Sequence, residues 1–347
     1  MSVIIKNPLT IVQSGGGGLT KPTTWAGLKA MNATDLAAIF PAGSIIDSIE
    51  CKIADSTGST VRDFYWQVAD YGTCQLENDN TDYPCVTLIA AAGLPTSLPF
   101  DGTERSQCDS TTETVAEDGV YYYGTTAASG TPTAANTTAL ALTTGDAIPY
   151  SDYARIFKSS INTTAANFVS LYSYAYNNYF FSNIRQYLNA SGAAGDWFNP
   201  SHVGDTLASQ YNSHRGFMTG VPSDFLAVLA QSKITVTGNT VTDGGTVYTM
   251  YDKFFLPSMY EVQLVDTPVD GAKMDFITSP ITNPAVRCKA YLGAAANGSA
   301  DNWWLRSPYQ SDVSHADYVS TNGGSRHNTA DNTYRVVPAC KIILAGA

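Results

Sequence analysis

The apolar residues of the N-terminal half follow two different spacings. From Trp25 to Phe40 they recur at helical spacing and stop before Pro41, which predicts a helix. Downstream, short runs rich in β-branched and aromatic residues are bounded by Ser, Thr and Gly, a pattern typical of strands. We therefore expect strands at residues 44–55, 63–72, 85–94 and 119–124.

The C-terminal half mixes helical and strand patterns. Ser182 is a candidate N-cap in front of one helical pattern, and Pro222 and Ser223 open another. Residues 233–245 alternate between apolar and polar around Gly238 and Asn239, which predicts a hairpin. The remaining elements that we expect are helices over 150–176 with an interruption near Asn162, a strand leading into a short helix over 253–265, and a final strand over 335–344.

The chain begins with a segment unlike the rest. Residues 3–13 alternate like a short strand, and the glycines from Gly15 to Gly18 cost too much backbone entropy to lie in a regular element. We expect an arm with a flexible joint over residues 1–24 and one domain over residues 25–347, because no later linker divides the chain. The first residues lack the basic and apolar regions of a secretory signal.

Charge and hydropathy argue against two classes of partner. The 347 residues include 19 Lys and Arg against 30 Asp and Glu, which gives a net charge of −11. Nucleic-acid binding is driven by basic residues that release counterions, so we expect no nucleic-acid partner. No run of the sequence approaches the roughly 18 apolar residues of a membrane span, so we expect no membrane insertion.

The sequence carries no recognisable motif for catalysis or metal binding. The histidines, His202, His214, His315 and His327, have no metal-ligand spacing, and the GxSxG and SxxK nucleophile motifs do not occur. The acidic stretch 76–83 offers oxygen ligands but lacks the spacing of a calcium-binding EF-hand. We therefore expect no catalytic residue, no metal and no cofactor, although scattered carboxylates alone do not exclude a glycosidase.

The cysteines form no CxxC pair. Most of them are interpreted as small buried hydrophobic residues: Cys51, Cys74, Cys85, Cys108, Cys288 and Cys340. A disulfide between Cys74 and Cys85 could close a loop, and free thiols are the alternative.

Residues 297–344 combine two kinds of position. One kind is apolar or bulky and forms a candidate core: Trp303, Trp304, Leu305, Ala316, Val319, Val336, Val337, Pro338, Ala339, Ile342 and Ile343. The other kind is polar or aromatic and forms a candidate ligand-binding set: Tyr309, Gln310, Ser311, Asp312, Ser314, His315, Asp317, Tyr318, Ser320, Asn322, Ser325, Arg326, His327, Asn328, Asp331, Asn332 and Tyr334.

The composition of the candidate set is typical of a binding surface. Tyr gives contact area at low entropic cost, the short polar residues adapt their hydrogen bonds, and Arg and His add anchors. An ordinary solvated loop region is the alternative. Such a region would normally carry Lys and Glu, which are nearly absent here.

Several sequence blocks resemble those of a known domain. WWLRSP at 303–308 and RVVPACKI at 335–342, with NGG and ADN between them, carry the resemblance, and YWQVADYG, SNIRQYLN and FFLPSMYEV are weaker upstream matches. Over roughly residues 45–345 the chain resembles a C-type-lectin-like domain of bacteria and phages, which often serves as the variable protein of diversity-generating retroelements. The resemblance implies an α+β, C-type-lectin-like fold, as in formylglycine-generating enzymes.

The resemblance also implies which positions vary. In those retroelements, copying errors at adenines exchange side chains near the end of the gene, and the candidate set looks like that outcome. Calcium-dependent sugar binding is not carried over, because DNWW at 301–304 does not match the lectin WND motif. The copper site of formylglycine-generating enzymes is not recognisable around Cys288 or Cys340.

The resemblance implies that the chain is a phage virion protein. It would belong to a tail or head fibre and would be assembled in the cytoplasm of the bacterial host. It would bind a host-surface or mucosal protein or glycan through the candidate set, and its arm would dock onto other virion proteins. A homotrimer would raise a weak affinity through avidity. The alternatives are a head-fibre or capsid decoration protein without host binding, and an enzyme on the same scaffold.

Overall fold

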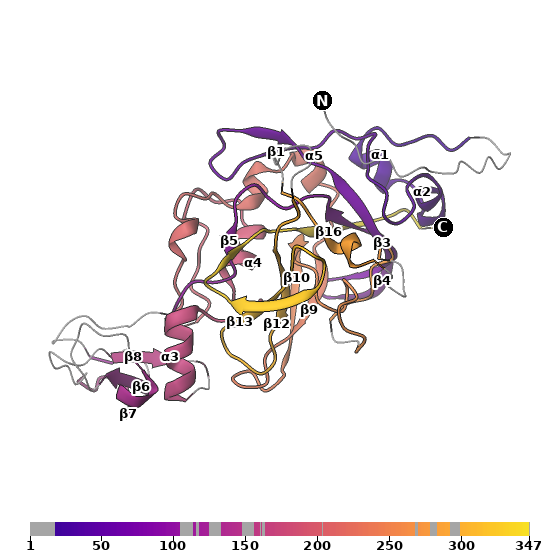
Figure 1. Ribbon diagram of the computed structural model, residues 1–347. Coiled ribbons are helices and arrows are strands. Elements are labelled where there is room, and N and C mark those ends of the chain that lie inside the picture. The colour runs from indigo at the N-terminus through magenta and orange to yellow at the C-terminus, as the bar shows by residue number, and fades with distance from the viewer. Residues whose placement is uncertain are drawn as a thin grey trace.

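A six-stranded antiparallel sheet forms the centre of the protein (Figure 1). The computed structural model describes residues 18–104, 114–115, 118–124, 133–147, 156–159, 161, 164–202, 204–267, 270–277, 283–291 and 299–346. The strands of the central sheet, in spatial order, are β10 (Val247–Asp252), β9 (Ser232–Thr237), β3 (Trp66–Leu76), β4 (Asp79–Ala90), β16 (Ala339–Ile343) and β11 (Phe254–Phe255).

The two edge strands of this sheet are neighbours in the sequence. β10 and β11 lie at opposite edges, yet only Lys253 separates them along the chain. The sheet must therefore curl until its edges come close together, and it is barrel-like and nearly closed. Its longest pairing joins β3 to β4 through a tight turn, in which Asn78 adopts a φ of +60°, a conformation that Asn tolerates. The acidic stretch 76–83 is the tip of this hairpin.

Short helices pack around the sheet, and side chains cap several of their N-termini. The α-helices are α1 (Trp25–Lys29), α2 (Ala33–Ile39), α3 (Ala165–Tyr174), α4 (Asn183–Leu188) and α5 (Ser223–Leu226). Ser182 accepts a hydrogen bond from the Arg185 N–H, which confirms the predicted N-cap. The single helix expected over 25–40 is wrong, because Asn32 caps a second helix there. The 3₁₀ turns are η1 (Ala134–Asn136), η2 (Ser209–Tyr211), η3 (Phe217–Gly220) and η4 (Pro284–Arg287).

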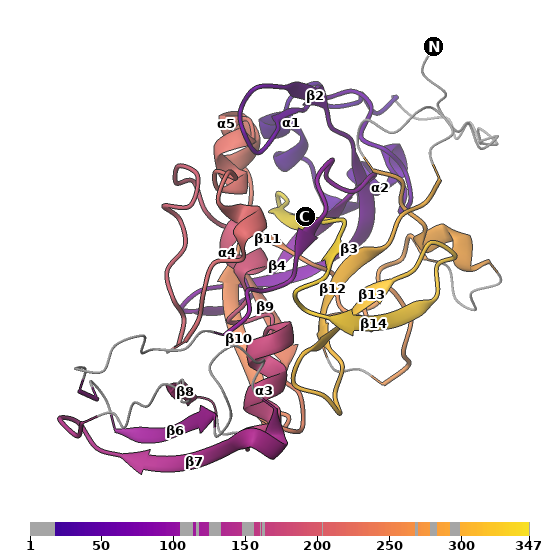
Figure 2. The ribbon, with the colours of Figure 1, turned by 60° about the vertical axis from the view of Figure 1, so that its left-hand side comes forward.

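Smaller antiparallel sheets surround the central one. β12 (Trp303–Pro308), β13 (His315–Val319) and β14 (Ser325–Thr329) form a sheet beside it, which is seen clearly in Figure 2. β6 (Gly119–Gly124), β7 (Thr137–Leu142) and β8 (Ile156–Ser159) form a lobe that projects from the body beside α3. The short pairs are β1 (Lys52–Ala54) with β2 (Val61–Asp63), and β5 (Leu98–Pro99) with β15 (Thr333–Tyr334).

One large hydrophobic core joins the central sheet, the helices and β12. The indole rings of Trp25, Trp66, Trp303 and Trp304 are almost completely buried in it. The apolar positions predicted as core between 303 and 343 are buried as well, apart from Ile343, which is half-buried. This part of the sequence prediction is confirmed.

The expected α+β, C-type-lectin-like fold is wrong. Of the described residues, 32% lie in strands and 16% in helices, and the strands form antiparallel sheets around a nearly closed barrel-like one. The helical content was overestimated because two patterns were interpreted as helices. The pattern over 150–176 contains the strand β8, and the pattern that opens at Pro222 contains a helix of only four residues. Short apolar runs do not distinguish a buried strand or turn from a helix, so spacing alone misleads there.

The expected hairpin over 233–245 is present in a different form. β9 and β10 pair as a hairpin, but the second strand begins at Val247, so Gly238 and Asn239 open a longer loop. Of the earlier expectations, residues 1–17 of the arm, Cys108 and residues 297–298 lie outside the described residues. None of the described helices has the length and apolar character that crossing a bilayer requires.

Candidate ligand-binding face

The candidate set lies on the sheet of β12, β13 and β14, on the turns that join its strands, and on the segment that follows β14 (Figure 2). Its exposed members are Tyr309, Gln310, Ser311, Asn322, Ser325, Arg326, His327 and Asn332. Its half-buried members are Asp312, His315, Tyr318, Ser320, Asn328, Asp331 and Tyr334. Ser314 and Asp317 are buried. The structure therefore gathers the set in one region but offers only part of it to a ligand.

One side of the sheet carries a cluster of rings. Asp317 pairs with His327 across β13 and β14, and directly paired residues share a face. The Tyr309 ring stacks on the His327 imidazole with centroids 3.9 Å apart, and His315 meets His327 edge-on at 5.7 Å. Tyr309 remains 37% exposed. We call Tyr309, His315 and His327 the ring cluster.

The other two tyrosines of the set pack inward. Tyr318 and Tyr334 lie with ring centroids 4.3 Å apart, and each contacts the buried Trp304, at 6.1 and 4.6 Å. Asn328 donates a hydrogen bond of 2.7 Å to the Tyr334 hydroxyl. Burial, together with a hydrogen bond to Tyr334, raises the pKa of Tyr318 to about 12. These tyrosines support the sheet as much as they face solvent.

Neighbouring segments hold the turn between β12 and β13 through its main chain. Within the turn, the Asp312 carboxylate accepts from the main-chain N–H groups of Ser314 and His315. The side-chain amide of Asn177 donates hydrogen bonds to the carbonyl oxygens of Tyr309, Asp312 and His315, at 3.3, 2.8 and 2.8 Å. Asn177 is fully buried, so these bonds are shielded from water. Every residue has a main-chain carbonyl, so this support does not depend on which side chains the turn carries.

The loop between β9 and β10 also binds the turn between β12 and β13. The N–H and the hydroxyl of Thr240 both donate to the carbonyl oxygen of Gln310, at 2.9 and 2.7 Å. The main-chain N–H of Asn177 donates to the carbonyl oxygen of Val313 at 3.1 Å. The side-chain amide of Gln310 adds a longer hydrogen bond to the Thr237 carbonyl oxygen, at 3.3 Å.

A buried polar network holds Asn177 and the loop that carries Thr240 in place. The Asp243 carboxylate accepts hydrogen bonds from the Tyr176 hydroxyl, from the Asn178 amide and from the main chain of Asn239. Asn239 also donates to the Asn177 side-chain oxygen at 3.0 Å. Desolvation raises the pKa of Asp243, although these hydrogen bonds act in the opposite direction. The network joins the loop after β9 to the segment after α3, and both hold the turn.

β12 itself is anchored by a buried ion pair. Arg306 is 1% exposed and donates to both carboxylate oxygens of Glu261, at 2.5 and 2.9 Å. It also donates to the carbonyl oxygens of Thr235 and Leu256, both at 2.9 Å. A guanidinium with this many partners in a dry site fixes its strand in one position.

The two aspartates closest to the ring cluster have shifted pKa values. Desolvation raises the pKa of Asp317 to about 7, because this carboxyl group is buried beneath the sheet surface. Asp312 is also partly desolvated, yet hydrogen bonds from His315 and Ser314 lower its pKa. His315 lies 2.9 Å from the Asp312 carboxylate. The surface therefore carries a negative charge at Asp312.

Sequence reasoning missed the residues that support the turn. Asn177, Asn239 and Asp243 are far from the turn in sequence, and a polar residue in a predicted helix end or hairpin gives no sign of burial. The one available signal is the run of Asn, Thr and Asp between β9 and β10, which is unusually long and polar for a tight hairpin.

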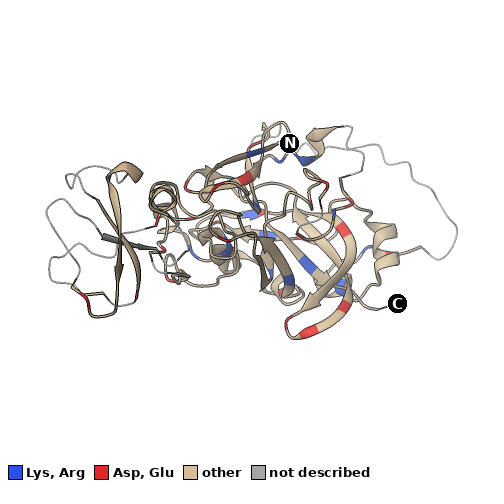
Figure 3. Cartoon of the chain, turned by 90° about the horizontal axis from the view of Figure 1, so that it is seen from below, with Lys and Arg blue, Asp and Glu red and all other residues tan. Residues whose placement is uncertain are grey.

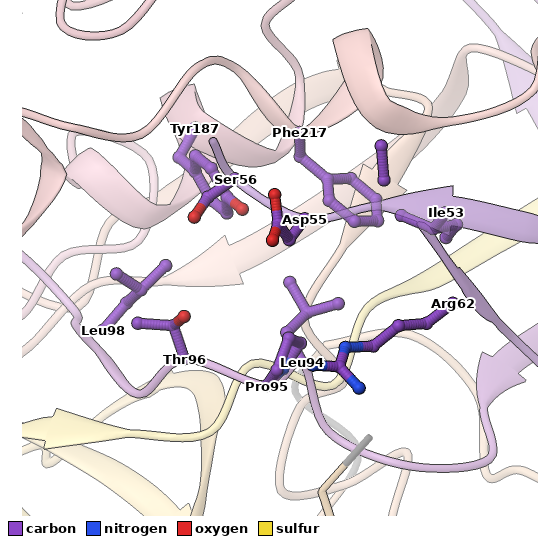
Figure 4. Close-up of a pocket in the computed structure, with 11 residues that line it drawn as sticks. Ile53, Asp55, Ser56, Arg62, Leu94, Pro95, Thr96, Leu98, Tyr187 and Phe217 are labelled. Atoms are coloured by element: carbon purple, nitrogen blue, oxygen red, sulfur yellow. The ribbon is translucent and has the colours of Figure 1, made fainter. Parts of the chain in front are cut away.

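Other hollows in the described residues lie away from this face. Figure 4 shows the one between Tyr187 and Phe217 on one side and Leu94 and Leu98 on the other. Its volume of about 20 Å³ holds no more than a water molecule. A hollow of about 560 Å³ lies between Thr103 and the loop that carries Asp205 to Asn212.

Charged residues are sparse along the described part of the chain. In Figure 3 most of the chain carries neither sign, and the blue segments are interspersed with red ones. Within the described part of the chain, no group of three or more His, Cys, Asp or Glu is placed to hold a metal ion.

Comparison with known proteins identifies one matching family. Residues 158–344, which make up more than half of the chain, match a family described as "Domain of unknown function (DUF6273)". The matched region begins within β8 and includes Asn177, Asn239 and the whole of the described candidate set. No curated protein and no solved structure matches the chain.

Proposed function

The chain belongs to the DUF6273 family, and we propose that it is a non-catalytic binding protein of a phage virion. Its ligand is a host-surface or mucosal protein or glycan. The binding face consists of the ring cluster, the exposed turn residues Gln310 and Ser311, and Ser325, which lies on the same side of β14 as His327. Arg326 pairs with Tyr318 and points to the opposite side of the sheet.

The observation that carries this proposal is how the turn from Tyr309 to His315 is held. Its supports, Asn177 and Thr240, contact main-chain oxygens, while side chains such as Tyr309 and Ser311 extend into solvent. A rigid backbone lowers the entropic cost of ordering a binding surface. Side chains that do not hold the fold together are free to be selected for a ligand.

The chemistry of the face suits a polar ligand. Aromatic and imidazole rings give contact area and hydrogen bonds, as at Tyr309 and His327. Such residues recur in paratopes, where they bind protein and glycan surfaces alike. Assembly as a homotrimer would place three faces on one particle and raise a weak single-site affinity.

We propose in addition that the exposed positions are exchanged during the life of the phage. The neighbouring DNA tests this part. A near-identical copy of the end of the gene, with adenines at the codons of the exposed positions and a reverse transcriptase gene beside it, is the expected result. Adenines concentrated instead at the core codons, such as those of Trp303 and Val337, would contradict it.

A binding assay tests the proposed function. Purified full-length protein carrying a fluorophore is titrated onto intact bacterial cells of several species and onto immobilised mucin. We expect saturable binding to at least one surface, and loss of that binding when Tyr309 and His327 are replaced together by Ala. Binding to none of these surfaces would instead favour a head-fibre or capsid decoration protein.

A further inference from the structure

The outer side of the central sheet carries two thiols on neighbouring strands. Cys74 on β3 pairs with Tyr83, and Cys85 on β4 pairs with Gly72, so the two cysteines lie on the same face, two residues apart along the ladder. The two thiols are close enough that each shifts the pKa of the other.

A hollow adjoins this pair. Both cysteines are buried, at 4% and 1% exposure, and both pack against Ala230, Leu76 and Ile343. The same three side chains line a hollow of about 350 Å³, which also has Lys29 and Glu77 in its wall. The thiols are therefore covered by one layer of side chains next to a space that admits a small molecule.

From this placement we propose that Cys74 and Cys85 form a redox-active dithiol, which a small-molecule disulfide such as oxidised glutathione converts into an intramolecular disulfide. The Cys74 thiolate attacks one sulfur of the external disulfide, the external S–S bond breaks, and one glutathione leaves as its thiol. Cys85 then loses its proton and attacks the Cys74 sulfur, which releases the second glutathione. Two protein thiols are oxidised and one external disulfide is reduced to two thiols.

The surroundings set the order of attack. The neighbouring Cys85 thiol lowers the pKa of Cys74, and the positive charge of Lys341 acts in the same direction. The neighbouring Cys74 thiol and burial raise the pKa of Cys85. The thiolate is the attacking species in disulfide exchange, so Cys74 reacts first and Cys85 resolves the mixed disulfide.

The other cysteines in the described part of the chain provide internal controls. Cys51 and Cys340 are also buried, but they belong to the main core and line none of the hollows described above. Cys288 is half-buried and donates to the carbonyl oxygen of Thr321 at 3.1 Å. Oxidation at Cys74 and Cys85 alone therefore separates the proposed site from general thiol reactivity.

The experiment uses the full-length chain with Cys108→Ser and Cys288→Ser, incubated with oxidised glutathione and then denatured, alkylated, digested and mapped by mass spectrometry. We expect a peptide pair linked through Cys74 and Cys85 without glutathione, and alkylated Cys51 and Cys340. Alkylation of Cys74 and Cys85 to the same extent as Cys51 would overturn the proposal. The unsubstituted protein gives the same readout if the substitutions impair folding.

Single substitutions test the order of the steps. The Cys85→Ser variant should retain glutathione on Cys74, because no resolving thiol remains, and the Cys74→Ser variant should leave Cys85 reduced. Glutathione found on Cys85 instead would reverse the assigned roles. The Lys29→Glu variant should slow oxidation by the anionic oxidised glutathione several-fold, but not oxidation by neutral hydroxyethyl disulfide. Equal rates for Lys29→Glu and wild-type protein with both reagents would contradict access through the hollow.

Discussion

Tyr309 stacks on His327 with ring centroids 3.9 Å apart and ring planes 18° apart. Tyr309 follows β12 and His327 lies on β14, and β13 lies between these two strands in the sheet. The contact brings side chains from the turn after β12 and from the edge strand β14 onto one surface. Stacked rings that remain partly exposed present both apolar area and hydrogen-bonding atoms. The pair is the natural anchor of the proposed binding face.

Replacing Tyr309 tests this anchor. We expect Tyr309→Ala to weaken binding to the responsive cell or mucin surface about tenfold or more, as loss of an interface anchor does. Its free energy of unfolding should fall by less than about 1 kcal/mol, because the ring is exposed. Tyr334→Ala is the matched control, since it removes a ring that packs on Trp304. Urea denaturation that shows equal destabilisation by both substitutions would mean that Tyr309 is a packing residue.

Asn177 tests the support of the turn. Asn177→Ala removes three hydrogen bonds to main-chain oxygens of the turn, and it leaves the buried Asn239 amide without its Asn177 acceptor. We expect a loss of about 2–4 kcal/mol in the free energy of unfolding. We also expect faster hydrogen exchange for the amides of residues 309–315. Ser311→Ala, on the exposed side of the same turn, should change neither quantity measurably. Unchanged exchange in Asn177→Ala would show that other contacts hold the turn.

Asp317 gives the stability of the protein a pH dependence with a definite sign. Its pKa is about 7 in the folded protein, compared with an ordinary value of 3.8. Between these values the folded state binds a proton that the unfolded state releases, so this group makes stability fall as pH rises from about 4 to about 7. Allowing for the remaining solvent contact, we expect a fall of the order of 2 kcal/mol.

The Asp317→Asn variant isolates that contribution from other titrating groups. The variant should gain stability relative to the wild type as pH rises through about 7, and this gain should be absent near pH 4. Urea denaturation of both proteins across this range measures the difference. A difference in stability that is the same at every pH would contradict the raised pKa.

The buried ion pair under β12 should be costly to break. Arg306→Leu leaves the Glu261 carboxylate buried without its cation, and such changes cost about 3–5 kcal/mol. Lys273→Ala, which breaks an ion pair with the fully exposed Asp266, is the control and should have little measurable effect. Thermal unfolding of both variants gives the comparison. Similar melting temperatures for the two would show that the pair does not anchor β12.

Local signals predicted local features of the fold. Ser182 acts as the expected N-cap, GVYYYG forms β6, and the apolar frame around Trp303 and Val337 is buried. The predictions that failed depend on contacts distant in sequence. β10 and β11 are neighbours in the chain yet occupy opposite edges of one sheet, and no apolar period encodes that closure.

The candidate site shows the same division. Composition located the segment that lies on β12, β13 and β14, but it could not separate exposed positions from buried ones. Asp317 and Ser314 look like ligand-binding residues in the sequence and are buried in the structure. Which side of a strand a polar residue takes depends on pairing register, and a shift of one residue would exchange the two sides.

The central claim is that the exposed side chains of this face bind a ligand and contribute little to the fold. It is tested most directly by one protein, in which Tyr309, Ser311, Ser325 and His327 are all replaced by Ala. Its adsorption to the cell or mucin surface that binds the wild type is measured alongside its melting temperature. We predict that adsorption is abolished while the melting temperature stays within a few degrees of the wild-type value. Undiminished adsorption, or loss of cooperative unfolding, would contradict the account.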